Sequence, residues 1–153
     1  MTNITVHTDG ACKGNPGHGA WGIVIEDEAQ LLCRANRVPN TTNQKMELTA
    51  AIKALDALKG HVGRPIELIT DSDYLVKGMT QWMDGWKTKG WRGSNKKPVK
   101  NLELWQQLDT LNQLHDVTWT WIKGHSGNAG NELADALCNR AMTEGRIAER
   151  IIK

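Results

Sequence analysis

The chain has 153 residues, of which 24% are charged and 39% hydrophobic, and its formal net charge is +2. A chain of this length can bury about 70% of the surface that it exposes when unfolded, so we expect one globular domain over residues 1–153. Its apolar runs fall far short of the roughly 18 residues that a membrane helix needs, which argues against a membrane protein. There is no signal-peptide pattern, and the three cysteines form no disulfide or zinc motif, so we expect a cytoplasmic protein.

Basic residues are concentrated in one segment. Between positions 82 and 100 the sequence has six Lys or Arg residues and a single acid, while the rest of the chain is net negative. A local concentration of positive charge favours a polyanionic partner.

The pattern of predicted elements favours an α/β fold. Alternating apolar residues predict strands at 4–8, 20–26 and 31–38, and the short connections between them indicate an antiparallel meander. A helix follows, for which Thr41 and Gln44 fit a capping box. Further strands are predicted at 65–70 and 117–122, and helical patterns at about 72–86, 101–114 and 128–142. We therefore expect a mixed five-stranded sheet flanked by helices, with strands 1, 4 and 5 parallel.

The glycine-rich stretch HTDGACKGNPGHGAWG, residues 7–22, begins in the last two residues of the first predicted strand. Gly17, Gly19 and Gly22 match the letters of a dinucleotide-binding fingerprint, but that motif opens a helix, and a strand follows here. The stretch has no GK[ST] sequence, so it is not a P-loop either. Taken alone, Asp9 and Gly10 could be an ordinary hairpin turn.

Acidic residues follow two strands that we expect to be neighbours. Asp9 ends the first strand and Asp71 follows the fourth, and the carboxyl ends of parallel strands form the functional crevice of an open sheet. Glu47 lies in the first turns of a helix, and Asp135 lies on a partly apolar face of the last one. Each acid alone could be a helix cap or a solvated charge. Four carboxylates in one pocket would repel, and hard oxygen ligands without clustered Cys or His suit Mg²⁺ or Mn²⁺.

The stretches TDGACKGNPG, TTNQKMELTAAIKAL, ITDSDYL and GHSGNAGNELAD, in this order, resemble ribonuclease H, type 1, of the bacterial kind. The resemblance covers nearly the whole chain, and WMDGWKTKGWRGSNKKPVKN, at about 82–101, is similar to the family's basic protrusion. It implies a ribonuclease H-like fold and endonucleolytic cleavage of the RNA strand of RNA–DNA hybrids, leaving 5′-phosphate and 3′-hydroxyl ends. It also implies that Asp9, Glu47, Asp71 and Asp135 hold two Mg²⁺ ions, with Mn²⁺ as an alternative.

The resemblance extends to residues outside the acidic cluster. It implies that His125 assists proton transfer or product release, although a plain surface histidine is the alternative. The residues that it implies in hybrid binding are Cys12, Asn15, Thr42, Asn43, Gln44, Trp82, Lys87, Lys96, Lys97 and Asn101. For Gln44 the capping box remains an equal alternative. We interpret Trp105, Trp119 and Trp121 as core residues, and Trp82, Trp86 and Trp91 as either surface or core.

Two positions depart from the commoner family pattern. Asp73 stands where a glutamine is frequent, and Asn40 stands where a basic residue often supports a phosphate pocket. Two other functions stay open: another nuclease or recombinase of the same superfamily, and a hybrid-binding module without catalysis. We expect a monomer with no obligate protein partner.

Overall fold

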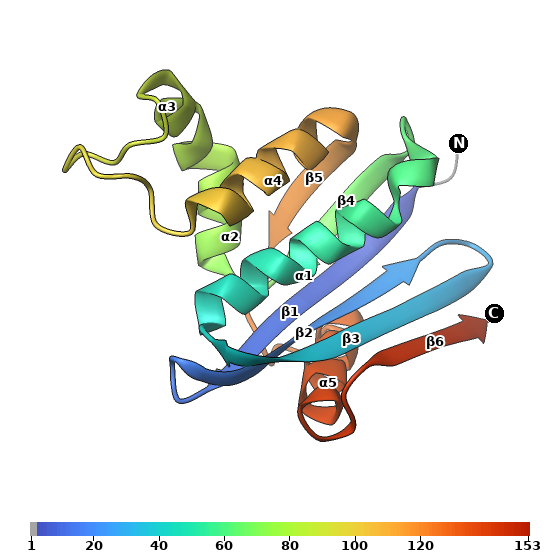
Figure 1. Cartoon of the computed structure of the whole chain (residues 1–153). Coiled ribbons are helices and arrows are strands. Elements are labelled where there is room, and N and C mark those ends of the chain that lie inside the picture. Colours follow the sequence, from blue (N-terminus) through green and yellow to red (C-terminus); the bar gives the residue numbers. More distant parts are fainter. Residues whose placement is uncertain (1–2) are drawn as a thin grey trace.

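The computed structural model describes residues 3–153, which form one mixed sheet of six strands with helices on both faces (Figure 1). The strands are β1 (Ile4–Lys13), β2 (Gly17–Glu26), β3 (Gln30–Thr41), β4 (Pro65–Thr70), β5 (Asp116–Trp121) and β6 (Ile147–Ile152). The helices are α1 (Asn43–Ala57), α2 (Asp73–Lys77), α3 (Met83–Thr88), α4 (Leu102–Leu114) and α5 (Ala129–Glu144). The strand order is β5-β4-β1-β2-β3-β6.

The predicted fold class is confirmed, and the sheet has one strand more than predicted. β1, β2 and β3 form the antiparallel meander, while β4 pairs in parallel with both β1 and β5. The sixth strand, β6, pairs antiparallel with β3 at the edge of the sheet. Only Ile147 of β6 is buried, because this edge strand packs little of its length against the core. The β6 sequence therefore needs no alternation of apolar and polar residues, which is the pattern that predicted the other strands.

Two hydrophobic cores lie on opposite faces of the sheet. The larger core joins β1 and β4 to α1 and α4, and Trp105 is completely buried in it. The smaller core packs α5 against β2 and β3, around Cys138 and Leu137. Because helices pack against both faces of the sheet, the side chains of its central strands are held in fixed positions. Among residues 3–153, no helix combines the length and apolar character that crossing a bilayer would require.

The segment from Asp73 to Thr88 is helical throughout, but its hydrogen bonding changes along its length. A π-helical turn, Gly78–Trp82, joins α2 to α3. At this turn Tyr74, Trp82, Trp86 and Trp105 form a chain of aromatic contacts with ring centroids 5.2–6.0 Å apart. The base of the basic protrusion, residues 82–100, is thereby packed onto the larger core.

This packing predicts opposite effects for two glycines of the same helical segment. A Cβ at Gly78 would overlap the Trp105 ring, whereas nothing lies within 4 Å of a Cβ at Gly85. Gly78→Ala should therefore lower the free energy of unfolding by about 1–3 kcal/mol, because overpacking forces the aromatic cluster apart. Gly85→Ala should raise it by about 0.5–1 kcal/mol through helix propensity. Urea denaturation of both variants tests this, and equal effects would contradict it.

Candidate active site

Two neighbouring parallel strands bring Asp9 and Asp71 to the same edge of the sheet. The register aligns Thr8 of β1 with Thr70 of β4, and each acid is the next residue along its chain. Asp9 is only 8% exposed, and its carboxylate accepts a hydrogen bond from the Gly10 amide at 3.0 Å. The expected juxtaposition at the carboxyl ends of the two strands is therefore present.

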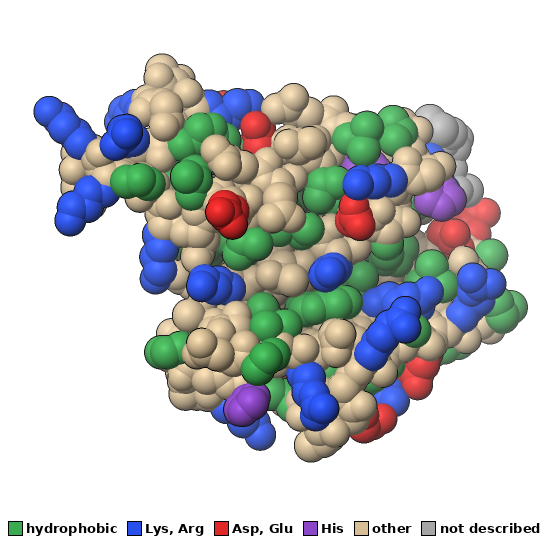
Figure 2. All heavy atoms as spheres, viewed as in Figure 1, with side chains coloured by type: hydrophobic (Ala, Val, Ile, Leu, Met, Phe, Trp, Pro, Cys, Tyr) green, Lys and Arg blue, Asp and Glu red, His purple; other side chains and the backbone are tan. Residues whose placement is uncertain are grey.

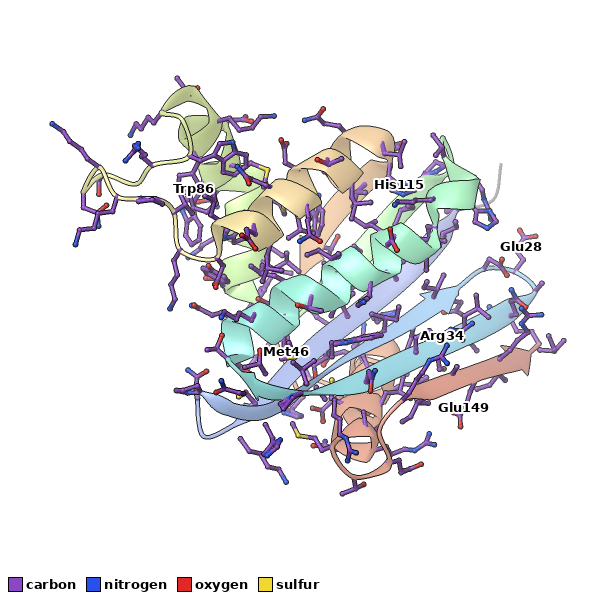
Figure 3. The ribbon with its side chains drawn as sticks, viewed as in Figure 1. Glu28, Arg34, Met46, Trp86, His115 and Glu149 are labelled. Atoms are coloured by element: carbon purple, nitrogen blue, oxygen red, sulfur yellow. The ribbon has the colours of Figure 1, made fainter. Side chains whose placement is uncertain are left out.

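Two glycines let the helices that carry the other acids approach these strands closely. A Cβ at Gly10 of β1 would overlap the backbone at Met46 and Glu47, so α1 lies directly on the strand there. Figure 3 labels Met46 in this position, at the N-terminal end of α1. A Cβ at Gly22, which is paired with Asp9, would come within 2.7 Å of the Ala134 carbonyl oxygen in α5. Part of the glycine-rich stretch thus serves helix packing.

The electrostatics show that the acids interact strongly. Burial, the charge of Asp71, and the hydrogen bond and charge of Asp135 together raise the pKa of Asp9 to about 8. Burial and the Asp71 charge raise the pKa of Glu47 to about 7, although a hydrogen bond from Ser72 opposes them. Without cations, the cluster therefore retains protons near neutral pH.

Asp71 is held by groups from three other parts of the chain. Asn131, in the first turn of α5, donates from Nδ2 to Asp71 Oδ2 at 3.4 Å. The Trp121 indole donates from Nε1 to the Asp71 backbone carbonyl at 3.1 Å. A Cβ at Gly124 would lie 2.8 Å from Asp71 Oδ2, so this loop also contacts the carboxylate. The sequence analysis did not predict that Asn131 contacts the acids. Its position one helical turn before Asp135 on α5 could have indicated this contact.

The donor set suits a hard divalent cation. All four side chains offer oxygen, and the raised pKa values of Asp9 and Glu47 follow from burial first and then from neighbouring carboxylate charge. Cys138 Sγ lies nearby and donates to the Asp9 carbonyl at 3.4 Å, but burial first, and then the carboxylate charges, keep its pKa high, so it stays a thiol. Within residues 3–153, no three His, Cys, Asp or Glu side chains converge as a ready-made single-ion cage. Instead, Asp9 and Asp135 are joined by a hydrogen bond.

His125 lies in the exposed loop between β5 and α5 and does not pack into the cluster. Its backbone adopts a left-handed conformation with φ 54°. The preceding residue, Gly124, contacts Asp71, so the histidine is anchored beside the acids through its chain neighbour. Its proton-transfer role remains a prediction.

The end of β1 and the β1–β2 turn are fastened to the end of β3 and the start of α1. Asn15 Oδ1 accepts from the Asn43 amide at 2.8 Å, and Cys12 Sγ donates to the Thr41 carbonyl at 3.3 Å. The predicted capping box is wrong, because Thr42 caps α1 by accepting from the Lys45 amide at 3.2 Å, and Thr41 is buried in β3. Gln44 instead lines a cleft with residues of the protrusion.

The protrusion carries four of the ten predicted binding residues, and Figure 2 shows its Lys and Arg side chains reaching into solvent at the left. Lys96 and Lys97 lie in its exposed loop, and Trp82 at its base is 36% exposed. Lys87 differs, because its ammonium is 3.0 Å from Asp109. Trp86 and Trp91 pack partly against the core, as Figure 3 shows for Trp86.

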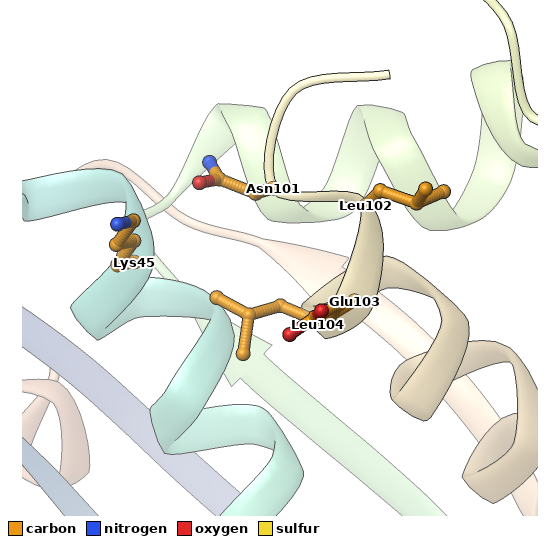
Figure 4. A pocket seen from close by; sticks show the side chains of 5 residues that line it. All are labelled: Lys45, Asn101, Leu102, Glu103 and Leu104. Atoms are coloured by element: carbon orange, nitrogen blue, oxygen red, sulfur yellow. The ribbon is translucent and has the colours of Figure 1, made fainter. Parts of the chain in front are cut away.

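A cleft of about 490 Å³ separates the starts of α1 and α4 (Figure 4). Lys45 approaches it from α1 and Asn101 from the turn before α4. Asn101 also donates from Nδ2 to the Tyr74 hydroxyl at 3.2 Å. None of the four acids lines this cleft, so it belongs to the surface between α1 and the protrusion.

Asp73 and Asn40 are the two residues that depart from the commoner family pattern. The Asp73 carboxylate pairs with Lys77 at 2.9 Å, and Asn40 is exposed with φ 50°.

The raised pKa of Asp9 predicts a pH-dependent effect of Asp9→Asn. An unfolded aspartate ionises near pH 3.9, whereas folded Asp9 ionises near pH 8, so stability contributed by its protonated form is lost as the pH rises through about 8. Asn keeps the acceptor for Gly10 and carries no charge. In EDTA, the variant should therefore gain thermal stability over the parent, and more at about pH 9 than at about pH 5.

Asp84→Asn is the matched control for net charge, because Asp84 is exposed on the protrusion, away from the cluster. It should follow the parent at both pH values. A difference between Asp9→Asn and the parent that does not change with pH would contradict the prediction.

Comparison with known proteins identifies the family. The family model described as RNase H matches residues 1–143. The ribonuclease H of Cupriavidus necator is 51% identical over 144 residues, which cover 93% of this chain and 97% of that protein. The ribonuclease H of Alkalilimnicola ehrlichii is 54% identical over 139 residues, covering 90% and 92% respectively.

A solved structure agrees with these relatives. LC9-RNase H1, described as a type 1 RNase H with the type 2 active-site motif, is 32% identical and aligns with a TM-score of 0.83. The match covers 97% of this chain and 78% of that chain. The fold and the sequence thus point to the same family.

Proposed function

The chain belongs to the ribonuclease H family, and on that premise we propose that it hydrolyses the RNA strand of RNA–DNA hybrids endonucleolytically at its four-carboxylate cluster. The products would carry 5′-phosphate and 3′-hydroxyl ends. The observation that supports this proposal is the adjacency of Asp9 and Asp71 at the ends of two parallel strands. Burial and the charges of Asp71 and Asp135 raise the pKa of Asp9, and burial and the Asp71 charge raise that of Glu47.

Enzymes of this family generally depend on a metal ion. We propose that Asp9, Glu47, Asp71 and Asp135 hold two Mg²⁺ ions, for which Mn²⁺ can substitute. Two such ions, when bound, activate water and stabilise the leaving oxygen of a phosphodiester. The protein's own part is to hold the carboxylates at fixed positions. The Gly10 amide donates a hydrogen bond to the Asp9 carboxylate, and the Asn131 side chain donates one to the Asp71 carboxylate.

His125 is the candidate for proton transfer. Its loop contacts Asp71 through Gly124, and its ring is exposed, so it can reach the edge where a scissile phosphate would lie. An imidazole can both accept and donate a proton, as this role requires. Since it is not part of the carboxylate cluster, it would assist the reaction without ligating a metal ion.

The surface around the start of α1 suits the two strands of a hybrid. Cys12 at the end of β1, Asn15 on the β1–β2 turn, and Asn43 and Gln44 in the first turn of α1 lie on the side of the RNA strand in this proposal. Thr42, Asn101 and Trp82 would contact the DNA strand. Lys96 and Lys97 are exposed and would bind phosphates, while Lys87 would first have to leave Asp109.

Asp71→Asn tests the catalytic cluster. The substitution keeps the size of the side chain and removes one charge from the cluster, so the geometry for metal binding should be lost while the fold persists. We expect turnover with Mg²⁺ to fall at least ~10³-fold, comparable to the loss of a key electrostatic group. Hybrid affinity should stay within about tenfold, because basic residues carry most of the binding.

Cleavage of labelled RNA–DNA hybrid, duplex RNA and duplex DNA by parent and variant gives the measurement. Asp73→Asn is the control, since Asp73 is exposed at the start of α2 and pairs with Lys77. A near-parental rate for Asp71→Asn would reject the proposed cluster. A parent that binds hybrid but does not cleave it would indicate a binding module.

The basic protrusion predicts a separate effect on binding. Replacing both Lys96 and Lys97 with Ala should raise KM and flatten its salt dependence, because each phosphate contact releases counterions with a slope of about 0.9 per charge on duplex DNA. Turnover should change little. Lys87→Ala should have a smaller effect, since its charge is already shared with Asp109. A fall in turnover with an unchanged salt slope would contradict the assignment.

A further inference from the structure

Trp121 is an unusual residue for the end of a strand beside the acidic cluster. Trp121 is predicted from the sequence to be a core residue, and this prediction is wrong, because 49% of its surface is exposed. Trp119, on the same strand and two residues earlier, packs against the larger core as predicted. Trp121 therefore contributes less than its size suggests to the hydrophobic interior.

The indole of Trp121 has a specific polar contact. Its Nε1–H donates to the backbone carbonyl of Asp71 at 3.1 Å. The β4–β5 ladder ends just before this point: Thr70 is paired with Trp121, and the Thr70 carbonyl accepts from the Ile122 amide at 3.0 Å. Asp71 lies one residue beyond the ladder, so a side chain supplies the hydrogen bond that a further strand residue would have given.

Asp71 is therefore fixed at two points. Trp121 holds its backbone from β5, and Asn131 contacts its carboxylate from α5. The Asp71 charge raises the pKa of both Asp9 and Glu47, so its position influences the whole cluster. A small displacement of a positioned group can cost about 10²-fold in rate.

We propose that Trp121 is a positioning residue for hybrid cleavage, which acts by holding the Asp71 backbone through its indole N–H. The proposal rests on the proposed function, in which Asp71 belongs to the metal-binding cluster. Trp121 should therefore influence turnover and the Mg²⁺ requirement, and it should not influence hybrid affinity.

Trp121→Phe tests this, because Phe keeps an aromatic ring and removes the N–H donor. We expect kcat to fall about 10- to 100-fold and the Mg²⁺ concentration for half-maximal rate to rise, while KM stays within about threefold. Because the side chain is half exposed, thermal unfolding in EDTA should change little. Hybrid affinity measured in EDTA verifies that the variant is folded.

Trp119→Phe is the matched control on the same strand. It also removes an indole hydrogen bond, in this case from Trp119 Nε1 to Asn112 Oδ1 at 3.0 Å. Since this contact lies away from the cluster, it should lower thermal stability and leave kcat and the Mg²⁺ requirement as in the parent.

Three results would overturn the proposal. One is a Trp121→Phe variant with parental kcat and parental Mg²⁺ dependence. Another is a rise in KM at constant kcat, which would make the ring a substrate contact. The third is an equal loss of kcat in Trp119→Phe, which would make the effect a general one of the strand. Failure of the proposed function is separate, because it would appear as near-parental cleavage by Asp71→Asn.

Discussion

Repulsion among four partly dehydrated carboxylates is the constraint on which the rest of this structure depends. Two charges about 5 Å apart at an effective dielectric near 20 repel by roughly 3 kcal/mol, and burial adds to that cost. The pKa values of about 8 for Asp9 and about 7 for Glu47 record the result. The chain must supply enough packing elsewhere to keep these groups together. The two cores on either side of the sheet, and close helix contacts at Gly10 and Gly22, provide it.

Rigid elements carry the acids, whereas exposed loops carry much of the proposed binding surface. Asp9 lies within β1, Asp71 follows β4, and Glu47 and Asp135 lie on helices packed against the sheet. Asn15, His125, Lys96 and Lys97 are exposed and lie on connections between elements. This division suits a nuclease that needs exact placement at the reacting phosphate and adaptable contacts along a long duplex. Asn15 is an intermediate case, because its contact with Asn43 ties a turn to a helix start.

The sequence predicted those features that depend on local periodicity or on strand direction. The meander and the parallel pairing of β1 with β4 follow from alternation and connection length, and they suffice to bring Asp9 and Asp71 together. Tertiary contacts decided the rest. β6 forms because β3 offers it an edge, and the pairing of Lys87 with Asp109 joins residues 22 positions apart. Trp121 is exposed although Trp119, two residues earlier on the same strand, packs against the larger core. The cap at Thr42 in place of Thr41 was a one-residue error, since β3 continues to Thr41.

The raised pKa values also link metal binding to protons. In the cation-free protein near neutral pH, Asp9 and Glu47 hold protons for a substantial part of the time, and Asp135 shares a hydrogen bond with Asp9. A divalent cation in the proposed site would have to displace those protons, so its apparent affinity would increase as the pH rises. The same burial that makes the cluster costly therefore also makes it selective for a strongly charged, oxygen-seeking ion.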